Sequence, residues 1–389
     1  MKINEDRIID DAQKIFTLTD SPSYSKDSIY TGDLDLINLV YGLTHGKCFI
    51  LPNIDNPYYD KLYLKRHNKN FDEYANLVIE YQDYYLKLAD IGERILNDNG
   101  MFFTHRDCKY KYTDKEAKEL LLDFFNDEGI NKYVKSLFDE ERIGFADLEE
   151  DTCEGFCINF ISNLKSYIVL SSRNEKLDLQ KLEYLAHELG HAVENKHLLN
   201  KHNNEFFDYK NLVFSEIAST FYEYEFLRYL QKNRIGLRDA NNLVNTKNIT
   251  TLSFLNEIKS FTVDSVEIDG DTYLALNDEY YVIDNKNIER IFKKENSNDM
   301  AYVEFKFYDP LIYGLGGYIA LHLSEIKKQD PKEFKKMWNN FLSMRTLMSY
   351  EDALRLFNIN KEDFLSGRVI EPIVKNDFNT YTKQLKKQL

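Results

Sequence analysis

Two histidines and a glutamate in the segment LAHELGHAVEN, residues 185–195, have the spacing of a metal site. On a helix His187 and His191 project from neighbouring positions one turn apart, so both imidazoles can reach one tetrahedral Zn²⁺. Glu188 lies beside them, where a carboxylate can act as a general base towards water. The spacing therefore predicts metal-assisted hydrolysis; the alternative is that the three residues form an ordinary polar helix face.

A catalytic zinc site uses three protein ligands and leaves one position open. Glu216, in the segment FSEIASTFYEYE, is the best candidate for the third ligand. Its apolar neighbours indicate a largely buried helix, and Glu223 lies two turns further along on the same face. We therefore expect His187, His191 and Glu216 to hold one Zn²⁺ per chain.

The motif requires a helix that shows its histidines on one side and packs its other side into a core. Residues 179–195 meet this requirement, because an apolar stripe falls opposite the histidines at 100° per residue. The stripe consists of Leu182, Leu185, Leu189, Ala192 and Val193. Asp178 is the expected N-cap of this helix. A second long helix is predicted over 211–233, with Glu216 inside it.

Further elements are predicted around these two helices. Residues 1–150 read as mostly helical, a strand is expected at 166–172, and 262–285 predict a hairpin or small meander. Before the motif, helices are expected over 72–98 and over 113–142, the latter with a Thr or Asp cap and a break near Gly129. After it, a helix is expected over 309–328, with Asp309 as cap and Pro310 in the first position. Two further helices are expected over 331–345 and 349–357.

Composition supports a mainly α chain with some β structure (α+β). The 389 residues include only 15 Gly and 6 Pro, and 30% are charged, which favours long helices. The net charge of −15 argues against nucleic acid as a partner. No window of 18 apolar residues or signal segment is present, and none of the four cysteines forms a CxxC pair, so we expect no membrane contact and a cytoplasmic location.

The segments HELGHAVEN and SEIASTFYE resemble the zinc peptidases of the oligoendopeptidase F and thimet oligopeptidase type, the M3 family. The resemblance implies a zincin-like helical catalytic domain with a small β-sheet edge and a β-hairpin. It also implies His187, His191 and Glu216 as zinc ligands, Glu188 as general base, and Glu223 as a residue that supports the ligands. The segment GFCINF…SYIVLSS resembles the family's edge strand, which would pair with an extended peptide.

Members of this family also carry His and Tyr groups that stabilise the tetrahedral intermediate. In this chain FYDPLIYGLGGYIALHL stands at the corresponding place. Tyr313 is the best match, with Tyr308 and Tyr318 as alternatives, and the family's upstream histidine is missing. Of the histidines outside the motif, His322 is the one with the best prospect of a functional role.

The resulting prediction is a zinc metalloendopeptidase that hydrolyses internal bonds of short unstructured oligopeptides. Two domains are expected: a helical N-terminal region at 1–150 that forms part of the cleft wall, and the catalytic domain at 151–389. The N-terminal lobe is expected to be reduced, because family members are longer. The predicted partner is a peptide substrate, and the sequence does not define the oligomeric state. The alternatives are an inactive, peptidase-like protein that binds peptides or other partners, and a zinc enzyme with another substrate.

Overall fold

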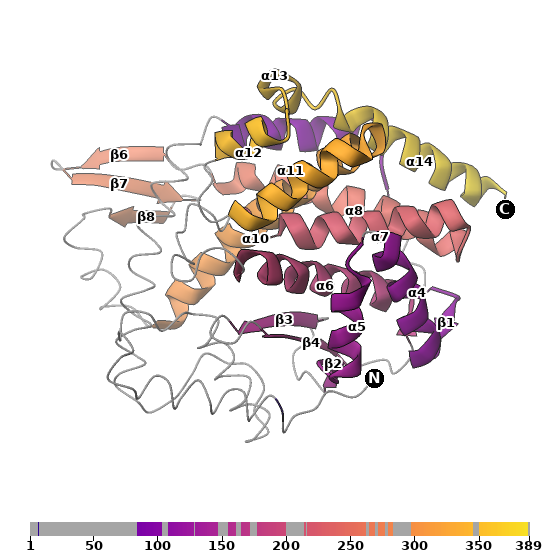
Figure 1. Cartoon of the computed structure of the whole chain (residues 1–389). Coiled ribbons are helices and arrows are strands. Elements are labelled where there is room, and N and C mark those ends of the chain that lie inside the picture. The colour runs from indigo at the N-terminus through magenta and orange to yellow at the C-terminus, as the bar shows by residue number, and fades with distance from the viewer. Residues whose placement is uncertain are drawn as a thin grey trace, which may run out of the picture.

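The chain is mainly helical, with small sheets of two or three strands in the computed structural model (Figure 1). This confirms the predicted fold class. None of the helices described is long and apolar enough to cross a membrane. The structure describes residues 7, 84–102, 108–127, 129–146, 155–160, 165–171, 177–199, 214, 216–261, 264–268, 271–276, 279–282, 297–344 and 350–387.

The predicted helices before residue 142 are present where the structure describes them. Residues 84–98 are helical, and the start of the prediction at 72–83 lies outside the described residues. Helix α4 (Asp114–Asp127) and helix α5 (Asn131–Asp139) follow, with the predicted break between them. Gly129 lies in that break with φ +77°, a backbone conformation that side chains with a Cβ rarely adopt.

A three-stranded sheet has β4 (Lys165–Ser171) as its central strand, which confirms the strand predicted at 166–172. Strand β3 (Gly155–Phe160) pairs antiparallel with β4, and β2 (Ile143–Ala146) pairs parallel with it. In the described part of the chain, β3 is therefore an edge strand of this sheet. The sheet joins residues on both sides of position 150, and the division into two domains there stays a prediction.

Helix α6 (Leu179–Leu199) carries the His-Glu motif. Asp178 caps it as predicted, because the Lys181 N–H donates to Asp178 Oδ1 over 3.0 Å. The predicted apolar stripe is fully buried. Glu183, Glu188 and Glu194, outside this stripe, are buried as well, whereas His187 and His191 are partly exposed. A two-stranded ladder of β1 (Lys111–Tyr112) and β5 (Leu177–Asp178) leads into the helix.

Three long helices pack against one another, and the first of them also packs directly against α6 (Figure 1). They are α7 (Ile217–Asn233), α8 (Leu237–Glu257) and α10 (Ser297–Gln329). Helix α10 approaches α8 closely at two glycines: a Cβ on Gly314 would lie 2.9 Å from Leu255 N, and one on Gly317 would lie 2.5 Å from Thr251 Oγ1. Such contacts hold α10 and α8 at a short distance from each other.

Two predicted helix starts are wrong. Glu216 is the N-cap of α7 rather than a residue in the middle of a helix, since α7 begins at Ile217. Phe214 is buried, but burial alone does not make the backbone helical. Helix α10 begins at Ser297, so Asp309 and Pro310 lie inside it. An interior proline costs about 3 kcal/mol, and the packing of α10 on α7 and α8 offsets that cost.

The predicted β structure at 262–285 is an antiparallel meander, which extends from one end of the helical body (Figure 1). Its strands are β6 (Asp264–Ile268), β7 (Asp271–Leu276) and β8 (Glu279–Val282). The two helices predicted after residue 330 are present as α11 (Pro331–Met344) and α12 (Tyr350–Leu356). The prediction did not include the two that follow, α13 (Lys361–Phe364) and α14 (Ile370–Lys386).

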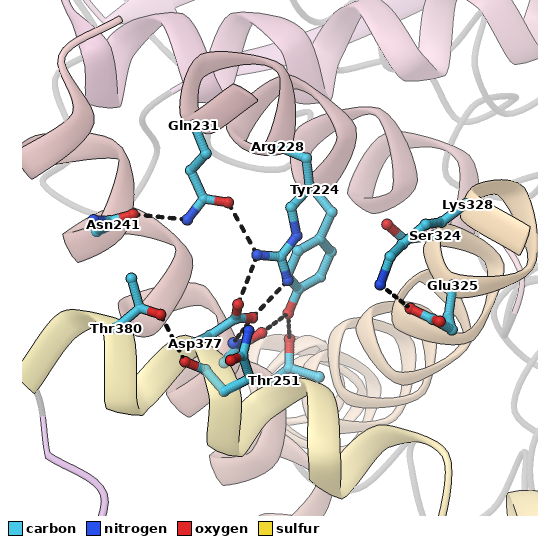
Figure 2. Close-up of polar contacts among 12 residues, drawn as sticks. Tyr224, Arg228, Gln231, Asn241, Thr251, Ser324, Glu325, Lys328, Asp377 and Thr380 are labelled. Atoms are coloured by element: carbon cyan, nitrogen blue, oxygen red, sulfur yellow. Dashed lines mark hydrogen bonds and ion pairs between the residues drawn. The ribbon is translucent and has the colours of Figure 1, made fainter. Parts of the chain in front are cut away.

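A buried polar network joins α14 to α7 and α8 (Figure 2). Arg228 of α7 donates two hydrogen bonds to Asp377 of α14, at 2.7 and 2.5 Å. Asn248 of α8 donates to the same carboxylate at 2.9 Å and accepts from Tyr224 at 3.1 Å. A hollow of about 950 Å³ adjoins the network between α7, α10 and α14, and none of the His-Glu motif lines it.

Candidate metal centre

The three residues predicted as metal ligands meet at one point. His187 Nε2 lies 3.2 Å from Glu216 Oε2, and His191 Nε2 lies 3.3 Å from the same oxygen. One ligand atom from each residue lies within 4.8 Å of the others. The two imidazole rings are edge to face, with centroids 5.1 Å apart. Two nitrogens and one carboxylate oxygen therefore surround a small volume, as ligands around a single cation do.

Two glycines allow α6 and α10 to approach α7 closely at the candidate site. Gly190, inside the motif, faces α7, and a Cβ there would lie 2.9 Å from the Ala218 carbonyl oxygen. Gly316 of α10 faces the start of α7, and a Cβ there would lie 3.0 Å from the Cβ of Glu216. The sequence pattern had indicated no role for either glycine. Two features of the sequence could have indicated these close approaches. One is the glycine between the two histidines of the motif, and the other is the GLGG run in α10.

Glu216 is held as a carboxylate at the N-terminus of α7. Ser219 Oγ lies 2.8 Å from Glu216 Oε2 and donates to it, and the positive end of the helix dipole also favours a negative charge. Burial alone would raise the pKa of Glu216. His191 and His187 outweigh burial and hold the pKa of Glu216 well below its usual range. This ionised form is the one that binds a metal.

Both histidines lie close to carboxylates: His187 to Glu216 and Glu223, and His191 to Glu216. Burial opposes their protonation, but Glu216 and Glu223 raise the pKa of His187 to about 10, and Glu216 raises the pKa of His191. His187 Nδ1 lies 3.0 Å from Glu223 Oε2. A proton on Nδ1 that is donated to Glu223 leaves Nε2 free to bind a cation. The donor set of two imidazoles and one carboxylate thus fits Zn²⁺.

Glu188 is buried next to the three candidate ligands, with 7% of its surface exposed. Burial raises the pKa of Glu188, while His187 and His191 act in the opposite direction. A carboxylate with a raised pKa is a stronger base near neutral pH. Strand β3 packs against the helix that carries Glu188. Burial raises the pKa of the Cys157 thiol of β3 well above its usual range, and the charge of Glu188 adds to this effect. The edge strand and the candidate base are therefore neighbours.

The three candidate tyrosines lie on α10 in different surroundings. Tyr313 is half-buried one turn before Gly316, and its ring centroid lies 5.8 Å from that of Phe254. Tyr318 is fully buried, and its hydroxyl donates to the Phe364 carbonyl oxygen over 2.6 Å. Tyr308 belongs to the helix, but its side chain lies outside the described residues. Tyr318 therefore has a structural contact, and a catalytic part for Tyr313 stays a prediction.

His322 is a core residue and no part of the metal centre. It is 2% exposed, and its ring centroid lies 5.1 Å from those of both Tyr318 and Phe364. Burial lowers the pKa of His322 to about 3, so the imidazole is neutral at physiological pH. Its position on α10 thus serves aromatic packing.

One further residue at the centre, Lys247, comes from a segment in which no helix or strand was predicted. Lys247 of α8 places its Nζ 2.6 Å from Glu223 Oε2. Its side chain is 17% exposed. The local pattern around Lys247 offered no signal, because its partner lies 24 residues earlier on another helix.

Comparison with known proteins finds similarity among solved structures. No family model matches the chain, and no curated protein matches it. PZ peptidase A, solved with an inhibitor, is similar at a TM-score of 0.49 and 12% identity, over 98% of this chain and 70% of that one. A Bacillus anthracis protein provisionally named oligoendopeptidase F has a TM-score of 0.47 and 11% identity, over 80% of this chain and 56% of that one. A Chlamydophila abortus protein provisionally named a peptidase has a TM-score of 0.47 and 13% identity, over 81% and 56%. The chain thus spans little more than half the length of the last two proteins.

Proposed function

We propose that this chain is a zinc metalloendopeptidase that hydrolyses internal bonds of short, extended peptides. The observation that carries the proposal is the meeting of His187 Nε2, His191 Nε2 and a Glu216 oxygen within 4.8 Å of one another, with Glu188 buried beside them. Three protein ligands with a fourth position open are typical of catalytic zinc, whereas structural zinc has four.

His187, His191 and Glu216 would hold the metal. When bound, zinc supplies a Lewis acid that polarises a carbonyl and makes water a better nucleophile near neutral pH. Glu223 supports this set, because its contact at 3.0 Å with His187 Nδ1 orients the ring and leaves Nε2 as the ligand atom. The carboxylate and the two imidazoles come from two helices held in contact at Gly190, so the set is rigid.

Glu188 is the proposed general base. A buried carboxylate with a raised pKa accepts a proton from the attacking water and then donates it to the leaving amine. Tyr313 is the proposed hydrogen-bond donor to the oxyanion that forms on the substrate carbonyl. Both roles require the peptide to lie between α6 and α10.

An extended peptide is the proposed substrate because β3 is the edge strand of its sheet in the described residues. Main-chain groups on such an edge bind a peptide strand with little dependence on its sequence. Strand β3 packs against α6, the helix that carries Glu188, so a strand added at its edge would bring a peptide bond close to the base. Most strands of folded proteins are already paired or protected at their edges, which favours short unstructured peptides.

The test is to compare wild type with Glu188→Gln on a library of quenched fluorescent peptides, with zinc present and after chelation. We expect cleavage by the zinc-loaded wild type only. Glu188→Gln removes the base but keeps the shape of the side chain, so turnover should fall about 10²–10⁴-fold. Native mass spectrometry should still find one zinc ion per chain in the variant.

Glu194→Gln is the matched control, since Glu194 is a buried glutamate on the same helix, six residues further along. It should retain wild-type turnover. Near-full activity of Glu188→Gln would refute the role of Glu188. A wild type that binds one zinc but cleaves no peptide would favour the peptide-binding alternative instead.

A further inference from the structure

Lys247 occupies an unusual position for a lysine. It lies on α8, which supplies none of the three candidate ligands, yet its ammonium group reaches the layer directly behind them. Its Nζ lies 2.6 Å from Glu223 Oε2, and the same oxygen lies 3.0 Å from His187 Nδ1. One carboxylate oxygen is therefore shared between a cation of α8 and a ligand histidine of α6.

A second group restrains the same carboxylate. Glu183, one turn before His187 on α6, is 5% exposed and hydrogen-bonds to Glu223. Burial and the charge of Glu223 raise the pKa of Glu183 well above its usual range, so Glu183 supplies the proton of that hydrogen bond. Glu223 itself is 2% exposed. The carboxylate thus has contacts from α6 and α8, and each contact limits its rotation.

We propose that Lys247 is a positioning residue of the metal centre, which acts through Glu223 on the orientation of His187. The proposal rests on the proposed function, since it assumes that His187 is a ligand. The ion pair between Lys247 and Glu223 fixes Oε2 where it accepts the Nδ1 proton. The ring is then held with Nε2 towards Glu216 and His191. Hydrogen-bond partners behind a ligand histidine typically change metal affinity 10–100-fold when they are removed.

The physical basis is the loss of rotational freedom in a long side chain. Glutamate has several rotatable bonds, and a hydrogen bond to an imidazole alone does not select one rotamer strongly. A partly buried ammonium at 2.6 Å does so, because separating the two charges next to the buried Glu223 carboxylate costs more than on the surface. Without Lys247, Glu223 gains freedom to turn away from His187, and part of the ligand preorganisation is lost.

The experiment measures zinc affinity of metal-free protein by competition with a chromophoric chelator, which does not depend on activity. Lys247→Met keeps most of the side-chain volume and removes the charge. We expect it to weaken zinc binding about 10–100-fold. In a Glu223→Gln background, which already lacks the ion pair, the same change should weaken zinc binding less than about threefold. The visible spectrum of the Co²⁺ form should also shift in Lys247→Met, since the geometry of His187 changes.

Lys259→Met is the matched control. Lys259 follows α8 in a short 3₁₀ turn (Ile258–Phe261), and it forms ion pairs with Asp90 and Glu93 at 2.7 and 2.5 Å, away from the ligands. This variant should bind zinc as wild type does. If Lys247→Met does not fold, Lys247→Gln replaces it, with a smaller expected loss of about tenfold.

The possible results separate the two proposals. If wild type binds no zinc, the proposed function fails. If wild type binds zinc and the Lys247 variants bind it equally well, only the positioning role is wrong. An equal loss of affinity in the wild-type and Glu223→Gln backgrounds would also refute it, since Lys247 would then act by packing rather than through Glu223.

Discussion

Gly190 and Ser219 bring α6 and α7 into backbone contact: a Cβ on Gly190 would lie 2.6 Å from the Ser219 Cα. Real Cβ atoms essentially never approach another heavy atom this closely, and the atoms contacted belong to the backbone, so no side-chain rotation can relieve the contact. The glycine inside the metal motif is thus required by packing. It sets the distance between the helix with the histidines and the helix with Glu216.

Gly190→Ala should therefore destabilise the protein, although alanine is the better helix former. Helix propensity alone predicts a gain of up to about 1 kcal/mol, whereas overpacking predicts a loss of about 1–3 kcal/mol. We expect the loss, together with weaker zinc binding, because α6 and α7 must move apart. Urea unfolding of the metal-free protein measures the first effect and chelator competition the second. A more stable variant with unchanged zinc affinity would show that the helices have room there.

Tyr313 and Tyr318 should respond in opposite ways to loss of their hydroxyl groups. Tyr313→Phe removes the proposed oxyanion donor, and kcat should fall about 10²–10³-fold without a change in zinc affinity. Tyr318→Phe leaves the buried Phe364 carbonyl without its donor at 2.6 Å, and stability should fall by about 1–3 kcal/mol with kcat unchanged. Steady-state kinetics of both variants measure the change in kcat, and urea unfolding of both measures the change in stability. A loss of kcat in Tyr318→Phe alone would reverse the assignment.

Local sequence rules predicted the elements whose ends depend on neighbouring residues. Thr113 caps α4 as one of the two expected caps: its Oγ accepts from the Glu116 N–H at 3.3 Å, and Glu116 Oε2 accepts from the Thr113 N–H at 2.8 Å. The Asp178 cap, the break at Gly129 and the meander were predicted for the same reason. Their signals all lie within a few residues of the element they define.

Features that depend on packing between distant segments were not predictable in this way. Lys247 on α8 contacts Glu223 on α7, and no rule of local sequence spacing relates positions 223 and 247. Pro310 lies inside α10 rather than at its first position. The long-range packing of α10 outweighs the cost of a proline in the helix interior. The meeting of the three candidate ligands was predictable, since two of them share one helix and the third lies at the start of the next helix along the chain that the structure describes.

Asp377→Ala should destabilise the protein by about 3 kcal/mol, because it leaves the Arg228 guanidinium and the Asn248 amide of the polar network without their acceptor. Asp363→Ala is the control, since its ion pair with Arg368 is exposed on both sides and should cost about 0–1 kcal/mol. Urea unfolding measures both variants. Equal losses would mean that the buried network adds no more stability than a surface pair.

His322 should make the protein less stable at mildly acidic pH. Its pKa is about 3 in the folded chain, because burial disfavours the charged ring, and about 6.5 in the unfolded chain. Between these values the unfolded state binds a proton that the folded state does not, so stability falls as the pH falls below about 6.5. Between pH 7 and pH 5 this group should cost about 2 kcal/mol.

His322→Phe tests this, because phenylalanine does not titrate and can pack against Tyr318 and Phe364. Urea unfolding with a chelator present, at pH 7 and at pH 5, gives the pH-dependent loss for each variant. The loss should be about 2 kcal/mol smaller in His322→Phe than in wild type, since all other titrating groups are common to both. His197→Gln, a change at a partly exposed histidine, should keep the wild-type loss. The same pH-dependent loss in wild type and His322→Phe would mean that the imidazole can take up its proton inside the folded core.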